Sequence, residues 1–122
     1  MKLITAIVKS QKLDELVQAL IDQGVRGLTV TEVRGFGRQY GQLATGQDHA
    51  AAGLTGPAGE RIAALVPKVR LDLVVLNEDA ETIVDVIAKR ARTETIGDGK
   101  IWVVAVGSAL RIRTGERDRA AI

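Results

Sequence analysis

Apolar residues follow two spacings along this chain, one typical of strands and one typical of helices. Four segments rich in β-branched and apolar residues are predicted to be strands: residues 3–8, 28–37, 69–76 and 101–106. Two segments carry apolar residues at helical spacing: residues 13–21 and 80–91. The predicted order is β-α-β-β-α-β, the ferredoxin-like α+β fold. Many unrelated families share this fold, so the order alone does not identify a function.

Polar residues and glycine mark the ends of the predicted helices. Ser10 is placed to cap the start of the first helix, and Gly24 stands where a helix C-terminal glycine belongs. Asp79 is placed to cap the second helix.

The connection between the second and third strands is unusually long. Four glycines fall between Thr45 and Glu60, together with Pro57, and a short helix over residues 60–65 would fit the end of the segment. A loop of this length is either a tolerated surface insertion or a mobile arm that orders on a ligand or partner.

Composition narrows the function classes. The chain has 122 residues, a net charge of +2, no cysteine and one histidine. These features predict one domain over residues 1–122, with no thiolate metal site and no catalytic constellation, hence a protein that is not an enzyme. Three scattered aromatic residues cannot build a base-stacking platform, so no nucleic-acid partner is expected. The beginning of the chain is predicted to be a strand and not a signal peptide, and no apolar run has membrane-spanning length. We therefore expect a cytoplasmic protein with no membrane insertion.

The most informative segment is residues 93–103, which contains Gly97, Asp98, Gly99 and Lys100 directly before a predicted strand. Glycine lets the backbone approach an anion with its N–H groups turned inward, and the lysine adds a positive charge. The pattern fits a phosphate cradle, but spacing alone favours a plain turn over a ligand site.

This segment resembles a signature of the PII signal-transduction family, the trimeric regulators of nitrogen metabolism. The matching residues are Thr93, Gly97, Asp98, Gly99, Lys100, Ile101, Trp102, Val103 and Val106. Other segments resemble the same family in the same order: residues 1–8, 28–39, 67–70 and 110–116. The resemblance implies a homotrimer with three functional segments, namely a T-loop over residues 37–66, a B-loop over residues 92–100 and a C-terminal arm over residues 107–122.

The resemblance also implies that an adenine nucleotide binds between subunits, either ATP or ADP, with AMP as a further candidate. Gly35-Phe36-Gly37 is no dinucleotide fingerprint, because Gly41 follows at the wrong spacing and no helix opens there. The residues that the resemblance assigns to the nucleotide are Ile7, Thr29, Gly35, Gly37, Arg38, Asp72, Val74, Gly97, Asp98, Gly99, Lys100, Arg111 and Arg113. Ile7, Thr29, Asp72 and Val74 would line the adenine–ribose end, and family members often have a glutamate at the position of Asp72.

Arg111 and Arg113 alternate with apolar residues. In an extended segment they would share one face, either as a solvated edge or as a fork that holds polyphosphate. The resemblance favours the fork.

Gln39 and Lys68 bracket the long loop. By resemblance they would bind 2-oxoglutarate beside Mg-ATP, with Gln39 as a ligand of the magnesium ion. The T-loop would then control a membrane transporter or a metabolic enzyme.

Several departures favour a specialised branch of the family. The loop has no tyrosine beyond Tyr40 at its base, so uridylylation or adenylylation is not expected. Glu94 and Thr95 stand where glycine and lysine are common, and both changes should weaken triphosphate binding. Three alternatives therefore stay open: a PII-like sensor of another small ligand, such as bicarbonate with ADP or AMP; a small ferredoxin-like enzyme or metal-binding trimer; and a purely structural oligomer.

Overall fold

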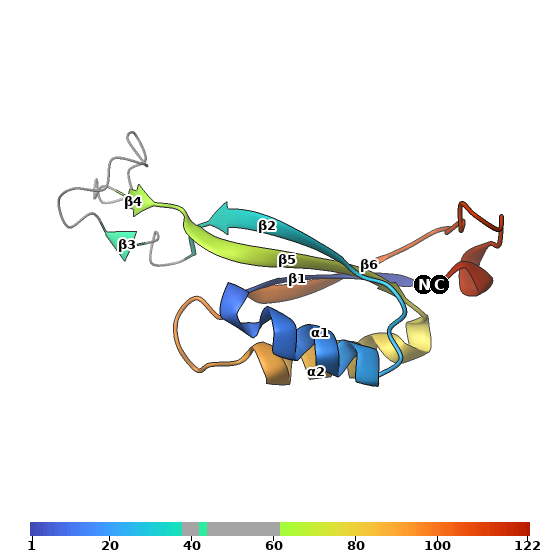
Figure 1. Ribbon diagram of the computed structural model, residues 1–122, viewed down its shortest axis with the longest axis horizontal. Coiled ribbons are helices and arrows are strands. Elements are labelled where there is room, and N and C mark those ends of the chain that lie inside the picture. The colour runs from blue at the N-terminus through green and yellow to red at the C-terminus, as the bar shows by residue number, and fades with distance from the viewer. Residues whose placement is uncertain (38–41, 44–61) are drawn as a thin grey trace.

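The computed structural model describes residues 1–37, 42–43 and 62–122, with the side chains of 42–43 and 62–64 left aside. A four-stranded sheet has the order β2-β5-β1-β6, and all three pairings in it are antiparallel. Its strands are β1 (Lys2–Val8), β2 (Thr29–Gly35), β5 (Val66–Val75) and β6 (Lys100–Ala105). Figure 1 shows both helices, α1 (Leu13–Asp22) and α2 (Ala80–Ala91), on one face of this sheet. The predicted ferredoxin-like α+β fold is confirmed.

The hydrophobic core lies between the helices and one face of the sheet. Alternate residues of β1 and β5 point to this face, among them Ile4 and Leu71, both fully buried. Leu16, Leu20 and Ile87 close the core from the helices. The core is aliphatic, and the two aromatic residues that the structure describes, Phe36 and Trp102, lie outside it.

The opposite face of the sheet is uncovered in one chain (Figure 1). Trp102 and Val104 of β6 remain 39% and 48% exposed on it. Thr5, whose side chain is buried, lies between Trp102 and Asp72 of the neighbouring strands. An amphipathic sheet of this kind requires a second surface to cover it.

The predicted end of the first helix is confirmed, and the predicted cap at its start is wrong. Gly24 has φ 84°, and its N–H donates to the Ile21 carbonyl at 2.9 Å. Ser10 instead lies inside a 3₁₀ helix, Ser10–Lys12, and no side chain caps α1. Asp79 occupies the N-cap position of α2 without a side-chain capping bond.

The short helix expected over residues 60–65 is also wrong. Strand β4 (Ile62–Ala64) pairs antiparallel with β3 (Gln42–Leu43). Pairing has overridden the helical preference of the alanines. Strand β5 then starts three residues earlier than predicted and includes Pro67, which lies beyond the end of β1 and is flanked only by β2.

Candidate functional site

The B-loop, residues 92–100, connects α2 to β6 and depends on two glycines. Gly97 and Gly99 have φ of 91° and 97°, a backbone conformation that is strained for residues with a side chain. A Cβ on Gly99 would lie 1.7 Å from the carbonyl oxygen of Ile7, so only glycine lets the loop lie against β1.

Asp98 holds the B-loop from inside. Its carboxylate accepts the backbone N–H of Thr93 at 2.8 Å and also the Thr93 hydroxyl. The ammonium of Lys9 lies 3.0 Å from the same carboxylate. The Thr93 hydrogen bonds, assisted by Lys9, hold the pKa of Asp98 far below its ordinary value. Asp98 is therefore an ionised structural acceptor.

Two lysines converge on this loop, Lys9 from directly after β1 and Lys68 from β5. The Lys9 ammonium donates to the hydroxyls of Thr93, at 2.6 Å, and of Thr95. The Lys68 ammonium donates to the carbonyl of Gly97. Burial and the neighbouring Lys9 charge lower the pKa of Lys68, while Asp98 opposes this shift. Two cations around one carboxylate leave an excess of positive charge at the loop.

Lys9 was not predicted as part of the site. The sequence did contain one indication, because Lys9 comes directly after β1. A polar residue that follows a central strand lies next to the loop at the same end of the sheet.

Glu94 has φ 58°, in the left-handed region that favours glycine. This geometry gives a physical reason for the glycine that is common at this position of the PII pattern. The Glu94 carboxylate lies 3.9 Å from the Arg92 guanidinium, and both side chains are exposed.

A pocket of about 620 Å³ lies beside the B-loop. Ile7, Gly99 and Lys100 line it together with Lys89 and Arg92 from the end of α2. Its three cationic side chains outnumber the two aspartates that also line it, so this surface has a small excess of positive charge.

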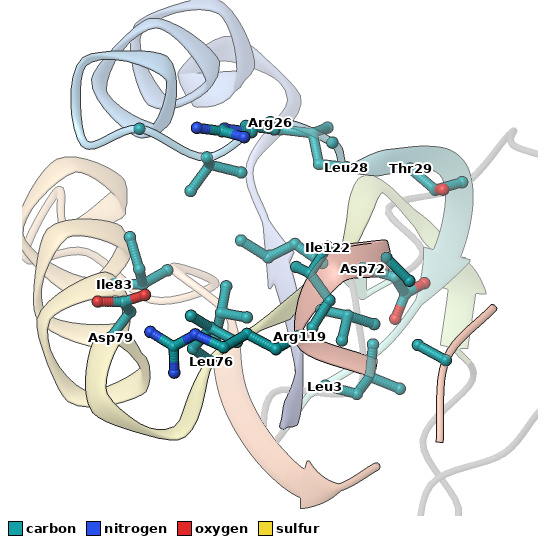
Figure 2. A pocket seen from close by; sticks show the side chains of 18 of the residues that line it. Leu3, Arg26, Leu28, Thr29, Asp72, Leu76, Asp79, Ile83, Arg119 and Ile122 are labelled. Atoms are coloured by element: carbon teal, nitrogen blue, oxygen red, sulfur yellow. The ribbon is translucent and has the colours of Figure 1, made fainter. Parts of the chain in front are cut away.

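A larger pocket of about 850 Å³ lies at the other end of the sheet (Figure 2). Strand β2 begins at Thr29, opposite Asp72, so residues 73–75 of β5 have no partner on that side. This notch in the sheet edge forms one wall of the pocket, and Leu28, Thr29 and Arg26 form another.

Asp72 is firmly held at this pocket. Its carboxylate accepts the Thr5 hydroxyl at 2.6 Å and the Arg70 Nε at 2.7 Å. The hydrogen bond from Arg70, with support from Thr5, lowers the pKa of Asp72 despite partial burial. Asp72 therefore stays charged at neutral pH and can accept a further hydrogen bond.

The extended arginine fork predicted in the C-terminal arm is wrong in its geometry. Residues 112–114 form a turn, closed by an antiparallel bridge between Leu110 and Arg117. Gly115, with φ 73°, allows the chain to return, and its N–H donates to the Arg111 carbonyl at 2.8 Å. Arg111 is half-buried and paired with Glu116, whereas Arg113 is exposed in the turn.

The family model for nitrogen regulatory protein P-II matches residues 1–116 of this chain. The chain belongs to the P-II family. It is 44% identical to nitrogen regulatory protein P-II 1 of Escherichia coli K12 over 122 residues, and 41% identical to nitrogen regulatory protein GlnK of the same strain over 124 residues. It is also 44% identical to nitrogen regulatory protein P-II of Klebsiella oxytoca over 122 residues. All of this chain and all of each relative are covered. The resemblance drawn from the motifs is confirmed.

The predicted nucleotide residues of this PII chain fall on separate surfaces. Ile7, Asp98, Gly99 and Lys100 line the pocket at the B-loop. The larger pocket is lined by Thr29, Asp72, Val74 and Arg111. Ile7 is thus separated from the three residues that were expected to share the adenine–ribose end with it.

The remaining predicted residues are distributed as follows. Gly35 ends β2 and Gly37 follows it, while Lys68 joins the B-loop through Gly97. Arg38, Gln39 and Tyr40 lie outside the described residues, so the predictions on them stand untested.

Two further findings concern the described part of the PII chain. Its helices are all too short or too polar to cross a membrane. Among the same residues, no three His, Asp or Glu side chains are grouped to hold a metal ion.

Proposed function

We propose that this PII chain is a signal-transduction regulator that binds adenine nucleotide between the subunits of a homotrimer. The observation that carries the proposal is the B-loop, which is folded around Asp98 with surplus positive charge. A preorganised loop does not have to be ordered when the ligand arrives, so more of the interaction energy goes into affinity.

Electrostatics favour a phosphate chain at the B-loop. Lys100 stands at the start of β6, and the ammonium groups of Lys9 and Lys68 lie behind the loop. Asp98 offsets one of these charges, and the remaining cations attract a polyanion. In this proposal the phosphates bind over Gly97, Gly99 and Lys100.

A site between subunits accounts for the separation of the predicted residues. The B-loop pocket of one chain would supply the phosphate contacts, and the arm of its neighbour would supply Arg113. The uncovered sheet face, with Trp102 and Val104, would be buried at the trimer axis.

The regulatory output would pass through the T-loop to a transporter or enzyme of nitrogen metabolism. Gln39 and Lys68 would bind 2-oxoglutarate, and Gln39 would complete the coordination of magnesium brought by ATP. Because Lys68 already donates to the Gly97 carbonyl, an oxoacid carboxylate would compete for an ammonium that stabilises the B-loop. Co-ligand and nucleotide would thereby be coupled through one side chain.

A second candidate is a PII-like sensor of bicarbonate with ADP or AMP. Two residues favour it. Thr95 stands at a position where the family commonly has a lysine, and it accepts a hydrogen bond from Lys9. Glu94 adds a negative charge to the loop. A loop with less positive charge discriminates less strongly in favour of a triphosphate.

Calorimetric titration tests both candidates. ATP, ADP and AMP are each titrated with and without 2-oxoglutarate or bicarbonate, into the wild type and the Lys100→Ala variant. Lys2→Ala, at the other end of β1 from the B-loop, is the matched control. Nucleotide binding that Lys100→Ala weakens about tenfold or more, and Lys2→Ala leaves intact, supports the proposal. Absence of nucleotide binding to the wild type would overturn it.

A further inference from the structure

The end of the C-terminal arm forms part of the wall of the larger pocket. Arg119, Ala121 and Ile122 belong to its lining, although they follow Thr29 and Asp72 by many residues in the sequence. Figure 2 shows Ile122 between the wall that carries Leu28 and Thr29 and the region of Leu3 and Arg119. We call residues 118–122 the strap. It lies beyond residue 116, where the match to the P-II family model ends.

The strap is folded back by two hydrogen bonds to the start of the arm. The N–H of Asp118 donates to the Ala109 carbonyl at 2.8 Å, and the Asp118 carboxylate accepts the Ala109 N–H at 3.1 Å. These bonds hold Asp118 at φ 52°, an uncommon value for a residue other than glycine. The 3₁₀ helix η4 (Asp118–Ala121) then carries the chain into the pocket.

One ion pair latches the strap to the body of the protein. The Arg119 guanidinium lies 2.7 Å from the Glu78 carboxylate, beside the start of α2. Both side chains are more than half exposed, so the pair contributes little and is easily broken. The strap thus belongs to the weakly held part of the fold, where local opening is easiest.

The strap shares this pocket with residues predicted to bind nucleotide. Thr29, Asp72 and Val74 are the residues assigned to the adenine–ribose end, and Ile122 lines the same pocket with a half-buried aliphatic side chain. An adenine ring and an aliphatic side chain would use the same apolar walls, formed by Leu3 and Leu28.

We propose that the strap is an autoinhibitory element that competes with the adenine–ribose end of the nucleotide for this pocket. The inference rests on the proposed nucleotide function. A chain with its strap docked is not competent to bind, so the apparent dissociation constant equals the intrinsic constant divided by the undocked fraction. Nucleotide binding in turn releases the strap, so its position reports the occupancy of the site.

The test uses point variants of the full chain. Glu78→Gln breaks the latch, and Ile122→Ser removes the apolar anchor. Glu81→Gln, an exposed carboxylate in the first turn of α2, is the matched control. ADP and ATP should bind about two- to fivefold more tightly to Glu78→Gln. They should bind up to about tenfold more tightly to Ile122→Ser, and Glu81→Gln should bind like the wild type.

Hydrogen exchange of the strap amides provides a readout that does not depend on affinity. The Asp118 and Ala120 amides should exchange faster in both variants, and faster in the wild type when saturated with ADP. Unchanged exchange on ADP binding, together with equal affinity of the variants and the wild type, would overturn the competition while leaving nucleotide binding in place. Weaker binding by Ile122→Ser would also overturn it, because the strap would then be part of the site. Failure of every protein to bind nucleotide would overturn the proposed function and the competition with it.

Discussion

The B-loop and the C-terminal arm are both predicted to contact nucleotide phosphates, and they are stabilised in different ways. The B-loop is organised around one carboxylate, Asp98, which receives hydrogen bonds from Thr93 and an ion pair from Lys9. The arm is held by the bridge between Leu110 and Arg117 and by exposed ion pairs at its surface. Its residues are exposed almost throughout, apart from a few half-buried positions.

This difference suggests that the B-loop and the arm have different roles in nucleotide binding. A loop with a satisfied internal network keeps its shape with or without a ligand, whereas an arm held by exposed ion pairs can change position at small cost. We expect the B-loop to set affinity and the arm to respond to occupancy.

Gly99→Ala should have the largest effect. Its Cβ would lie 1.7 Å from the Ile7 carbonyl oxygen at a φ of 97°, so the B-loop must leave its place against β1. We expect a loss of about 3 kcal/mol or more in the free energy of unfolding. Denaturant unfolding measures it. Gly107→Ala, where a Cβ meets nothing within 4 Å, is the control and should stay within a few tenths of a kcal/mol of the wild type.

Arg113→Ala should reduce nucleotide affinity without a comparable loss of stability. Arg113 lies exposed in the turn of the arm, and loss of a charge-assisted bond to phosphate costs about 1.5–3 kcal/mol. Arg117→Ala, at the closing bridge of the same turn, is the comparison. Calorimetry should show weaker binding for the first variant alone, and equal affinities would remove Arg113 from the site.

Asp98→Asn should change how stability depends on acid. The folded pKa of Asp98 is depressed, so its ionised form stabilises the fold above the unfolded pKa of about 3.9, and this contribution decreases as the pH falls toward the folded pKa. The wild type should therefore lose more stability than the variant between pH 5 and about pH 2. Urea unfolding across this range measures the difference, with Asp14→Asn on α1 as the control for loss of one surface charge. Parallel pH profiles for the wild type and Asp98→Asn would contradict the assignment.

Glu94→Gly should have the smallest effect. It removes a left-handed glutamate, with relief of about 1 kcal/mol of backbone strain, and the greater freedom of glycine in the unfolded chain offsets part of this gain. We expect a slightly raised melting temperature and somewhat tighter ATP binding, because a carboxylate near the phosphates is removed. Glu94→Gln separates the two contributions, since it removes the charge and keeps the strain.

The sequence was sufficient to predict the fold and the B-loop. Periodicity gave the order of the elements, since the core alternation of Ile4, Leu71 and Leu73 and the helical spacing of Leu16 and Leu20 are local properties. The glycines at 97 and 99 indicated only a turn, and the resemblance to the PII signature identified it as the B-loop. The structure adds that the φ values of both glycines are strained for other residues.

Features that depend on distant partners could not be predicted. Lys9 and Thr93 are far apart in the sequence and meet only because β1 lies beside β6 in the sheet. Strand β4 depends on β3, and the turn of the arm depends on Leu110 meeting Arg117. The position of the strap depends on a tertiary contact between Arg119 and Glu78 beside the start of α2, and no local pattern in the sequence predicts this contact.

Complementation between two variants tests most directly whether the site is completed between subunits. Lys100→Ala and Arg113→Ala chains are mixed, unfolded, refolded together and titrated with ATP. A site between subunits takes the B-loop from one chain and the arm from its neighbour, so some sites in the mixture combine an intact Lys100 with an intact Arg113. The account predicts that a class of sites with wild-type affinity appears in the mixture and in neither variant alone. A mixture with only weakened sites, although its chains are shown to be exchanged, would contradict a nucleotide site shared between subunits.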